Sequence, residues 1–299
     1  KIPTPKKSSN AVFLKEIRDT IRFLIKESNI PKKCMSGICL GVPGIIDVDK
    51  GKVIDAANLH ISNLPLAQSL KKSFKKNVWV CNDVDLGLLG ETWMGAAHSK
   101  KFVVGIFLGT GVGGAILSNG KLLTGKNIPA GDIGHMVVDI HGAKCACGNT
   151  GCLETIAARW AIEKRIQSEL KKGKTTKLKP ISKGKIKQVK SKLLKKGLKK
   201  NDPIVSNIMY EMADSLAHVM IGLRYLFQPE LFILGGGVIE ACDTFLIPAI
   251  EKRFSKYSFG KMGPCPIYPA ALGDDSVLMG GAAITFHRSG LKMFTEEPY

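Results

Sequence analysis

Three short apolar segments within residues 101–125, separated by turn residues, constrain the fold of this 299-residue chain more than any other feature. KFVVGIFLG and GGAILS predict two buried strands joined by the glycine-rich turn LGTGVGG. The Asn119-Gly120 dipeptide is typical of a tight hairpin turn, so a third strand should follow it. Further along the chain, helical patterns over 152–169 and 203–227 are followed by the apolar strand LFILGGGVI. A strand meander followed by helices and strands in alternation predicts an α/β domain.

The residues before 99 predict a second unit of the same class. Periodic apolar residues over 11–28, after the possible caps Ser9 and Asn10, indicate an amphipathic helix. MSGICLGVPGIIDVDKGKVIDAANL then predicts a strand, a turn and a hairpin. A helix over 66–74 and the short strand NVWVCND follow. The length of the chain suits two domains with a cleft between them.

This order of elements is that of the RNase H-like fold, and two such domains around a cleft form the actin or hexokinase type of protein. We assign residues 1–98, together with a C-terminal helix of about 282–299, to the first domain, and residues 99–281 to the second. The first domain opens directly at its helix, so we expect it to lack its first three strands and to be incomplete at its N-terminus.

The composition excludes several protein classes. Hydrophobic residues make up 44% of the chain, as in ordinary globular proteins. No apolar run approaches the roughly 20 residues that span a bilayer, so we expect no transmembrane segment and no membrane partner. Three of the eight cysteines are clustered and the others are scattered in apolar surroundings, which favours reduced thiols over a disulfide framework. We therefore predict a cytoplasmic protein.

The formal net charge of +19 raises the question of nucleic-acid binding. Much of the excess lies in residues 171–200, a lysine-rich stretch without an aromatic residue that would stack on bases. We interpret these lysines as solvated side chains on a loop and a helix and expect no nucleic-acid partner. A site for a polyanion stays open as the alternative.

A histidine and three cysteines form a candidate metal site. His135, Cys145, Cys147 and Cys152 supply one imidazole and three thiolates, the ligand set that tetrahedral zinc prefers. A structural zinc knuckle, of a kind that also occurs in some nucleic-acid-binding modules, would satisfy the same pattern. His141 is a more distant alternative ligand.

Two glycine-rich turns follow predicted strands. LGTGVGG at 108–114 lets backbone amides approach phosphate oxygens, and Thr110 adds a hydroxyl. The turn matches neither the Walker pattern nor the dinucleotide fingerprint, and alone it is a weak signal. LGGGV at 234–238 is a second turn of this kind, and the pair favours a nucleotide site.

Polar residues suited to a sugar and a proton transfer lie near these motifs. Asn82 and Asp83 close the strand NVWVCND, where a carboxylate can act as a general base for a hydroxyl or, alternatively, can cap the next helix. Asp132 and Glu154 flank the metal ligands, and a carboxylate can accept hydrogen bonds from two sugar hydroxyls. A zinc-bound histidine keeps a second ring nitrogen for a hydrogen bond.

Five motifs together resemble the ROK family of sugar kinases and sugar-responsive repressors. They are CND at 81–83, GTGVGG at 109–114, AGDIGH at 130–135, CACGNTGCLE at 145–154 and LGGGV at 234–238. The resemblance covers essentially the whole chain, except that the DxGGTK phosphate loop with which family kinases open is not found.

The resemblance implies a role for each motif, and a homodimer. Asp83 is expected to be the catalytic base, and a site for ATP with Mg²⁺ is expected at the two glycine-rich turns. The nucleotide-binding residues would be Gly109, Thr110, Gly111, Gly113, Gly235, Gly236 and Gly237. The sugar-binding residues would be Asn58, Asn82, Asp132, His135 and Glu154. Asp132 stands where the family usually has Glu, and His135 would also ligate a structural zinc.

We therefore predict ATP-dependent phosphorylation of a hexose by a glucokinase-like enzyme. The alternative is a sugar-sensing transcriptional repressor without its DNA-binding segment, because family repressors carry a helix-turn-helix ahead of the sugar domain. Retention of both GTGVGG and CND favours the kinase, since a regulator needs the sugar contacts but not the phosphate turn.

Overall fold

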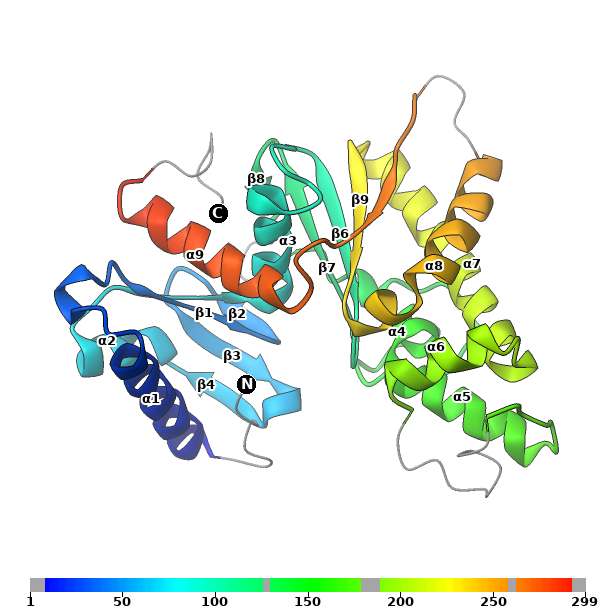
Figure 1. Cartoon of the computed structure of the whole chain (residues 1–299), viewed down its shortest axis with the longest axis horizontal. Coiled ribbons are helices and arrows are strands. Elements are labelled where there is room, and N and C mark those ends of the chain that lie inside the picture. Colours follow the sequence, from blue (N-terminus) through cyan, green and yellow to red (C-terminus); the bar gives the residue numbers. More distant parts are fainter. Residues whose placement is uncertain (1–8, 126–129, 179–188, 258–261, 292–299) are drawn as a thin grey trace.

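The computed structural model describes residues 9–125, 130–178, 189–257 and 262–291, and these form two lobes (Figure 1). Helices α3 (Asp83–Met94) and α9 (Ser276–Arg288) pack along each other between the lobes. The mixed α/β architecture expected from the sequence is confirmed. The domain boundaries remain a prediction. Helix α9 runs through the proposed boundary at 281, and residues 292–299 lie outside the described residues.

The first lobe contains two small sheets. Strands β1 and β5 pair in parallel, whereas β2, β3 and β4 form an antiparallel sheet. Among the described residues, β1 pairs with β5 alone. The elements are α1 (Asn10–Glu27), β1 (Ile38–Val42), β2 (Ile45–Asp47), β3 (Lys52–Ala56), β4 (Ile61–Leu64), α2 (Leu66–Phe74) and β5 (Val78–Asn82).

Helices α1 and α2 form where the sequence predicts them. The Ser9 hydroxyl accepts a hydrogen bond from the Val12 amide at 3.4 Å and so caps the start of α1. Helix α2 buries Leu66, Leu70 and Phe74, which recur every four residues and therefore share one face. These side chains join the core of the first lobe, which lies against the strands.

The second lobe is built on a five-stranded sheet with the order β10-β9-β6-β7-β8. The predicted meander of three antiparallel strands is confirmed, and β9 pairs in parallel with β6. The strands are β6 (Val103–Leu108), β7 (Val112–Ser118), β8 (Lys121–Leu122), β9 (Leu231–Gly235) and β10 (Ile267–Pro269). The helices are α4 (Glu154–Ala157), α5 (Arg159–Lys171), α6 (Ser191–Lys199), α7 (Pro203–Phe227) and α8 (Gly237–Phe254).

The central strands are apolar along their whole length because both faces of this sheet are covered. Val104 and Ile106 of β6 point into a core shared with α5, α7 and α8. Val103 of the same strand joins a second core with Leu88 of α3. A strand covered on both faces has no solvent side, so its sequence does not alternate between apolar and polar residues.

Helix α7 begins and ends as the sequence predicts. The Asp202 carboxylate accepts hydrogen bonds from the amides of Ile204 and Val205 at 3.1 and 3.0 Å, and Pro203 occupies the first turn. Although α7 has 25 residues, no helix in the described part of the chain is both long and apolar enough to cross a membrane.

The helix predicted over 152–169 is instead two helices, α4 and α5. Ala158 between them has extended backbone, with φ −68° and ψ 147°. The amide of Arg159 donates to the carbonyl oxygen of Gly109 at 3.1 Å. The chain is therefore bent against the glycine-rich turn, and a local pattern cannot reveal such a distant contact.

The packing of α3 on α9 yields a stability prediction. A Cβ at Gly280 would overlap the carbonyl oxygen of Leu86, which is backbone and cannot rotate away. Gly280→Ala should therefore lower the free energy of unfolding by roughly 1–3 kcal/mol, measured by urea denaturation. Gly222→Ala on α7 is the matched control, because a Cβ there meets nothing within 4 Å. It should be neutral or stabilising by up to about 1 kcal/mol, and equal effects of the two variants would contradict this packing.

Candidate functional site

The carboxyl end of β5 carries Asn82 and Asp83. Oδ1 of Asn82 accepts hydrogen bonds from the amides of Val84 and Asp85 at 2.8 and 3.3 Å, so Asn82 is the N-cap of α3. Its Nδ2 donates to the carbonyl oxygen of Gly44 at 3.1 Å and ties β5 to the turn after β1. The residue that caps α3 is therefore Asn82, and Asp83 is the first residue of the helix.

Asp83 has the environment of a proton acceptor. Its burial raises the pKa of the carboxyl above the usual value, and a hydrogen bond from the Val84 amide at 3.0 Å offsets part of this effect. No ion pair with a described residue holds the carboxylate in its charged form. A carboxyl whose pKa is raised in this way accepts a proton more readily.

The glycine-rich turn lies beside the start of α3. Gly109 donates its amide to the carbonyl oxygen of Gly111 at 2.9 Å, which closes the turn between β6 and β7. A Cβ at Gly113 would lie 2.5 Å from a methyl carbon of Val84, so only glycine lets the two segments meet without a shift. Thr110 is exposed at the tip. Asp83 and the turn are therefore neighbours in space.

The second glycine run lies at the same edge of the sheet. Gly235 pairs with Phe107 at the end of β9, and Gly236 has a positive φ of 84°. A Cβ at Gly236 would lie 2.5 Å from the carbonyl oxygen of Leu108. Gly237 begins α8, whose first-turn amides point toward this edge. Both glycine-rich turns thus stand side by side, as a nucleotide site requires.

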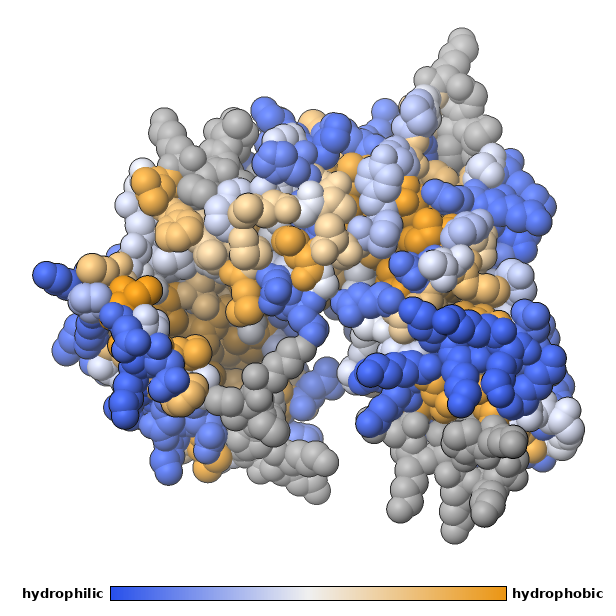
Figure 2. All heavy atoms as spheres, in the orientation of Figure 1, coloured by the Kyte–Doolittle hydropathy of each residue, from blue (hydrophilic) through white to orange (hydrophobic). Residues whose placement is uncertain are grey.

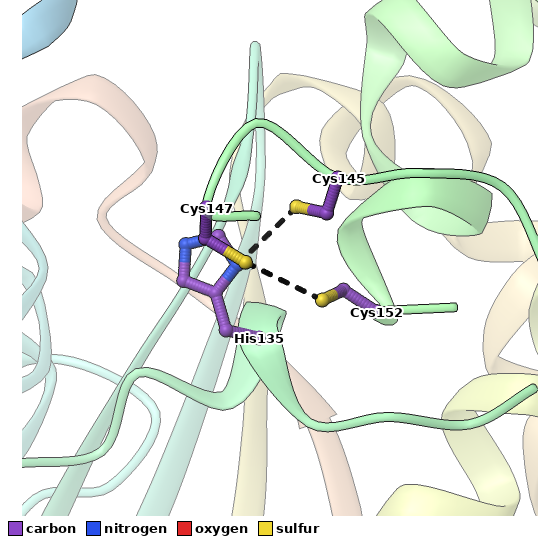
Figure 3. A group of neighbouring side chains, drawn as sticks. All are labelled: His135, Cys145, Cys147 and Cys152. Carbon is purple, nitrogen blue, oxygen red and sulfur yellow. Dashed lines mark hydrogen bonds between the residues drawn. The ribbon is translucent and has the colours of Figure 1, made fainter. Parts of the chain in front are cut away.

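The four predicted metal ligands come together (Figure 3). One donor atom from each of His135, Cys145, Cys147 and Cys152 lies within 4.8 Å of the others. Nδ1 of His135 is 3.5 Å from Sγ of Cys145, and the sulfur atoms of Cys147 and Cys152 are 3.6 Å apart. The edge of a zinc tetrahedron with sulfur ligands is about 3.7 Å, so the cluster fits this ion.

The thiols of this cluster differ in acidity. Burial, with a smaller effect of the Cys147 thiol, raises the pKa of Cys152 to about 12. The amide of Asn149 lowers the pKa of Cys147. Because a metal must displace the protons of its thiol ligands, binding is expected to weaken as the pH falls.

The loop that carries these ligands is held by its own backbone. The Cys145 amide donates to the carbonyl oxygen of Asn149, and the Val138 amide to that of Gly151, each at 2.8 Å. Gly151 has a φ of 74°, and a Cβ there would overlap the carbonyl oxygen of Asp139. Glycine is therefore required at the turn just before Cys152.

Three of the predicted sugar ligands, Asp132, His135 and Glu154, lie on this loop or next to it. Nε2 of His135, the ring nitrogen on the side away from Cys145, lies 3.8 Å from a carboxylate oxygen of the exposed Asp132. Glu154 accepts a hydrogen bond from the Val112 amide at 3.0 Å, which links the metal loop to the glycine-rich turn. Asn58 lies exposed in the short helix η2 (Ala57–Leu59) of the first lobe and makes no hydrogen bond to the other candidates that are described.

Sequence reasoning did not select Arg159. Its Nη2 donates to the hydroxyl oxygen of Thr110 at 2.9 Å. The sequence gives no local signal for this contact, because the helical pattern over 152–169 does not predict the break before α5. Figure 2 shows that the molecular surface is hollowed between the two lobes.

The chain is similar over most of its length to known proteins. The model of the ROK family matches residues 2–288. Glucokinase of Halalkalibacterium halodurans is 34% identical over 282 residues, which cover 94% of this chain and 85% of the relative. The N-acetylglucosamine repressor of Escherichia coli O157:H7 is 33% identical over 210 residues, which cover 70% of this chain and 50% of the repressor. The structure of a ROK family glucokinase from Streptomyces griseus, in complex with glucose and AMPPNP, superposes with a TM-score of 0.79 at 24% identity, covering 94% of this chain and 89% of the other.

The metal cluster yields the second prediction. Purified protein should contain about one equivalent of zinc per chain by elemental analysis. Cys152→Ser should lose that zinc and unfold at a lower denaturant concentration, because removal of a ligand opens the buried site. Cys34→Ser, which changes an exposed thiol outside the cluster, should keep both properties. Equal zinc content in the two variants would exclude Cys152 as a ligand.

Proposed function

Because the chain belongs to the ROK family, we propose that it is a glucokinase-like enzyme that transfers a phosphoryl group from ATP to a hexose. One contact carries this proposal: Gly113 against Val84 puts the start of α3, and so Asp83, beside the glycine-rich turn. Phosphoryl transfer needs a group that orients the attacking hydroxyl and donors that hold the phosphates. The glucokinase of Halalkalibacterium halodurans, which aligns with 94% of this chain, supports the same activity.

In the proposed reaction, an oxygen of a sugar hydroxyl attacks the terminal phosphorus of ATP. The bond between that phosphorus and the oxygen of the leaving ADP breaks, and the hydroxyl proton passes to the Asp83 carboxylate. Mg²⁺ bound with ATP would supply positive charge for the phosphates. The phosphates would lie at Gly109, Thr110, Gly111 and Gly113, and the adenosine at Gly235, Gly236 and Gly237.

The sugar would be held by hydrogen bonds from both lobes. Asn58 and Asn82 would contribute from the first lobe, and Asp132, His135 and Glu154 from the second. The carboxylate oxygen of Glu154 that does not bond the Val112 amide is available for a hydroxyl. Nε2 of His135 is available in the same way, since Nδ1 faces the sulfur of Cys145. Zinc would thus be structural and would also fix the orientation of a sugar-binding ring.

We also propose a homodimer in a reducing cytoplasm. All eight cysteines are free in the structure, and thiolate ligands for zinc require reduced sulfur. The family resemblance alone supports the homodimer.

A sugar-sensing repressor domain is the second candidate. It is supported by the N-acetylglucosamine repressor of Escherichia coli O157:H7, of which the aligned part covers half. The Asp83 carboxyl beside a glycine-rich turn favours the kinase, because sensing a sugar requires neither. A chain that binds a hexose without phosphorylating it would favour the repressor.

Substitution of Asp83 tests the kinase. Asp83→Asn keeps the shape of the side chain and should lower kcat by at least about a hundredfold, because the proton acceptor is lost. Hexose binding, measured by calorimetry, should change little. Asp19→Asn, on the surface of α1, is the control and should keep full turnover. Turnover is measured as ADP release in a coupled assay with each of a panel of hexoses. Turnover retained in Asp83→Asn would remove this residue from the mechanism.

The pKa of Asp83 adds a prediction on pH dependence. Because burial raises this pKa above 3.8, activity should fall on the acid side with an apparent pKa above that value. The folded state holds the proton more tightly than the unfolded state, so stability falls as the pH rises from about 4 through the raised pKa. Asp83→Asn should lack this fall, and its unfolding free energy relative to the wild type should rise between pH 4 and 7. A constant difference across that range would argue against a buried, proton-holding carboxyl.

A further inference from the structure

Arg159 is held against the glycine-rich turn by two hydrogen bonds, one from its backbone and one from its side chain. Its backbone amide donates to the carbonyl oxygen of Gly109 at 3.1 Å, and its guanidinium donates to the Thr110 hydroxyl oxygen at 2.9 Å. Both contacts depend on the extended residue Ala158, which ends α4 and turns the chain before α5. The cation is therefore held at the tip of the turn.

No described carboxylate pairs with the charge of Arg159. Glu154, five residues earlier, directs its carboxylate to the Val112 amide instead. Arg165 on the same helix does pair, with Glu211. Arg159 is also only partly buried, so a solute can reach it.

Several hydrogen-bond donors lie at this tip. Because the Thr110 oxygen accepts from Arg159, its own hydroxyl hydrogen is left to donate elsewhere. The amides of Thr110 and Gly111 donate to no described residue. Two amides, one hydroxyl and a guanidinium match a ligand that carries many acceptor oxygens and negative charge.

We infer that Arg159 binds the phosphate chain of the nucleotide donor directly, in addition to bracing Thr110. The inference rests on the proposed phosphoryl transfer, since it assigns the donor side of that site. A planar guanidinium suits phosphate because it offers two parallel N–H groups to two oxygens. A brace that acted only through Thr110 would not need a positive charge.

The test compares a nucleotide that carries a chain of three phosphates with one that carries a single phosphate. Binding of the triphosphate analogue AMPPNP with Mg²⁺, and of AMP, is measured by calorimetry on the wild type, Arg159→Gln and Arg159→Lys. Arg159→Gln should weaken AMPPNP about tenfold or more and leave AMP within about twofold. Arg159→Lys should bind AMPPNP with intermediate affinity, and it replaces Arg159→Gln in the test if the glutamine variant does not fold. Lys164→Gln, an exposed charge on the same helix, is the matched control and should change neither.

A second experiment distinguishes an arginine that only supports Thr110 from one that binds phosphate. Thr110→Val removes the hydroxyl that Arg159 contacts but keeps the cation. A phosphate-binding arginine predicts that Arg159→Gln weakens AMPPNP further in this background, whereas a mere brace predicts no further loss. An equal loss for AMP and AMPPNP, no loss, or no binding of AMPPNP by the wild type would overturn the inference.

The outcomes also distinguish this inference from the proposed function. If the wild type binds AMPPNP through Arg159 but phosphorylates no hexose, the kinase proposal fails and the inference stands. If the wild type phosphorylates a hexose and Arg159→Gln leaves the KM for ATP unchanged, the inference alone fails. The expected kinetic result is a raised KM for ATP with an unchanged KM for the sugar.

Discussion

The close approach of α3 to α9 is the constraint on which the rest of the structure depends. Gly90 and Gly280 sit where a side chain would overlap the backbone of the other helix. Helix α3 is buried from Asp85 to Thr92 and packs on the second sheet as well. Because α3 begins at Asp83, the position of the proposed catalytic carboxyl relative to the second lobe is set by helix packing and not by a loop.

A buried carboxylate fixes the other end of α3. Glu91 accepts hydrogen bonds from the amides of Ala96, Ala271 and Leu272 at 2.8, 3.0 and 2.9 Å. Two of these amides belong to the segment that leads from the second sheet into α9. Three donors compensate for the loss of water around a fully buried carboxylate. The connection between the lobes is therefore held by directional bonds as well as by apolar contact.

Local features of this chain could be predicted from sequence, and contacts between distant segments could not. The cap of α1 at Ser9 and the metal cluster of His135 and Cys152 depend on residues close in the chain, so their spacing was informative. The break at Ala158 depends on Gly109, 50 positions before Arg159, and no local sequence pattern contains both. Helix α3 shows no amphipathic period, because it is buried on all sides from Asp85 to Thr92.

One short segment joins the loop of the His135 and Cys152 cluster to the glycine-rich turn. Between Cys152 and Arg159 the chain makes three attachments in eight residues: a metal ligand, the Glu154 bond to Val112, and the Arg159 bonds to the turn. The first attachment lies next to the proposed sugar ligand His135, and the last lies on the proposed donor side. A displacement of Cys152 would therefore pass through α4 and the extended residue Ala158 to the glycine-rich turn, and so to both sides of the proposed site. In the proposed reaction, a metal held by this cluster would therefore influence the geometry of phosphoryl transfer without touching a phosphate.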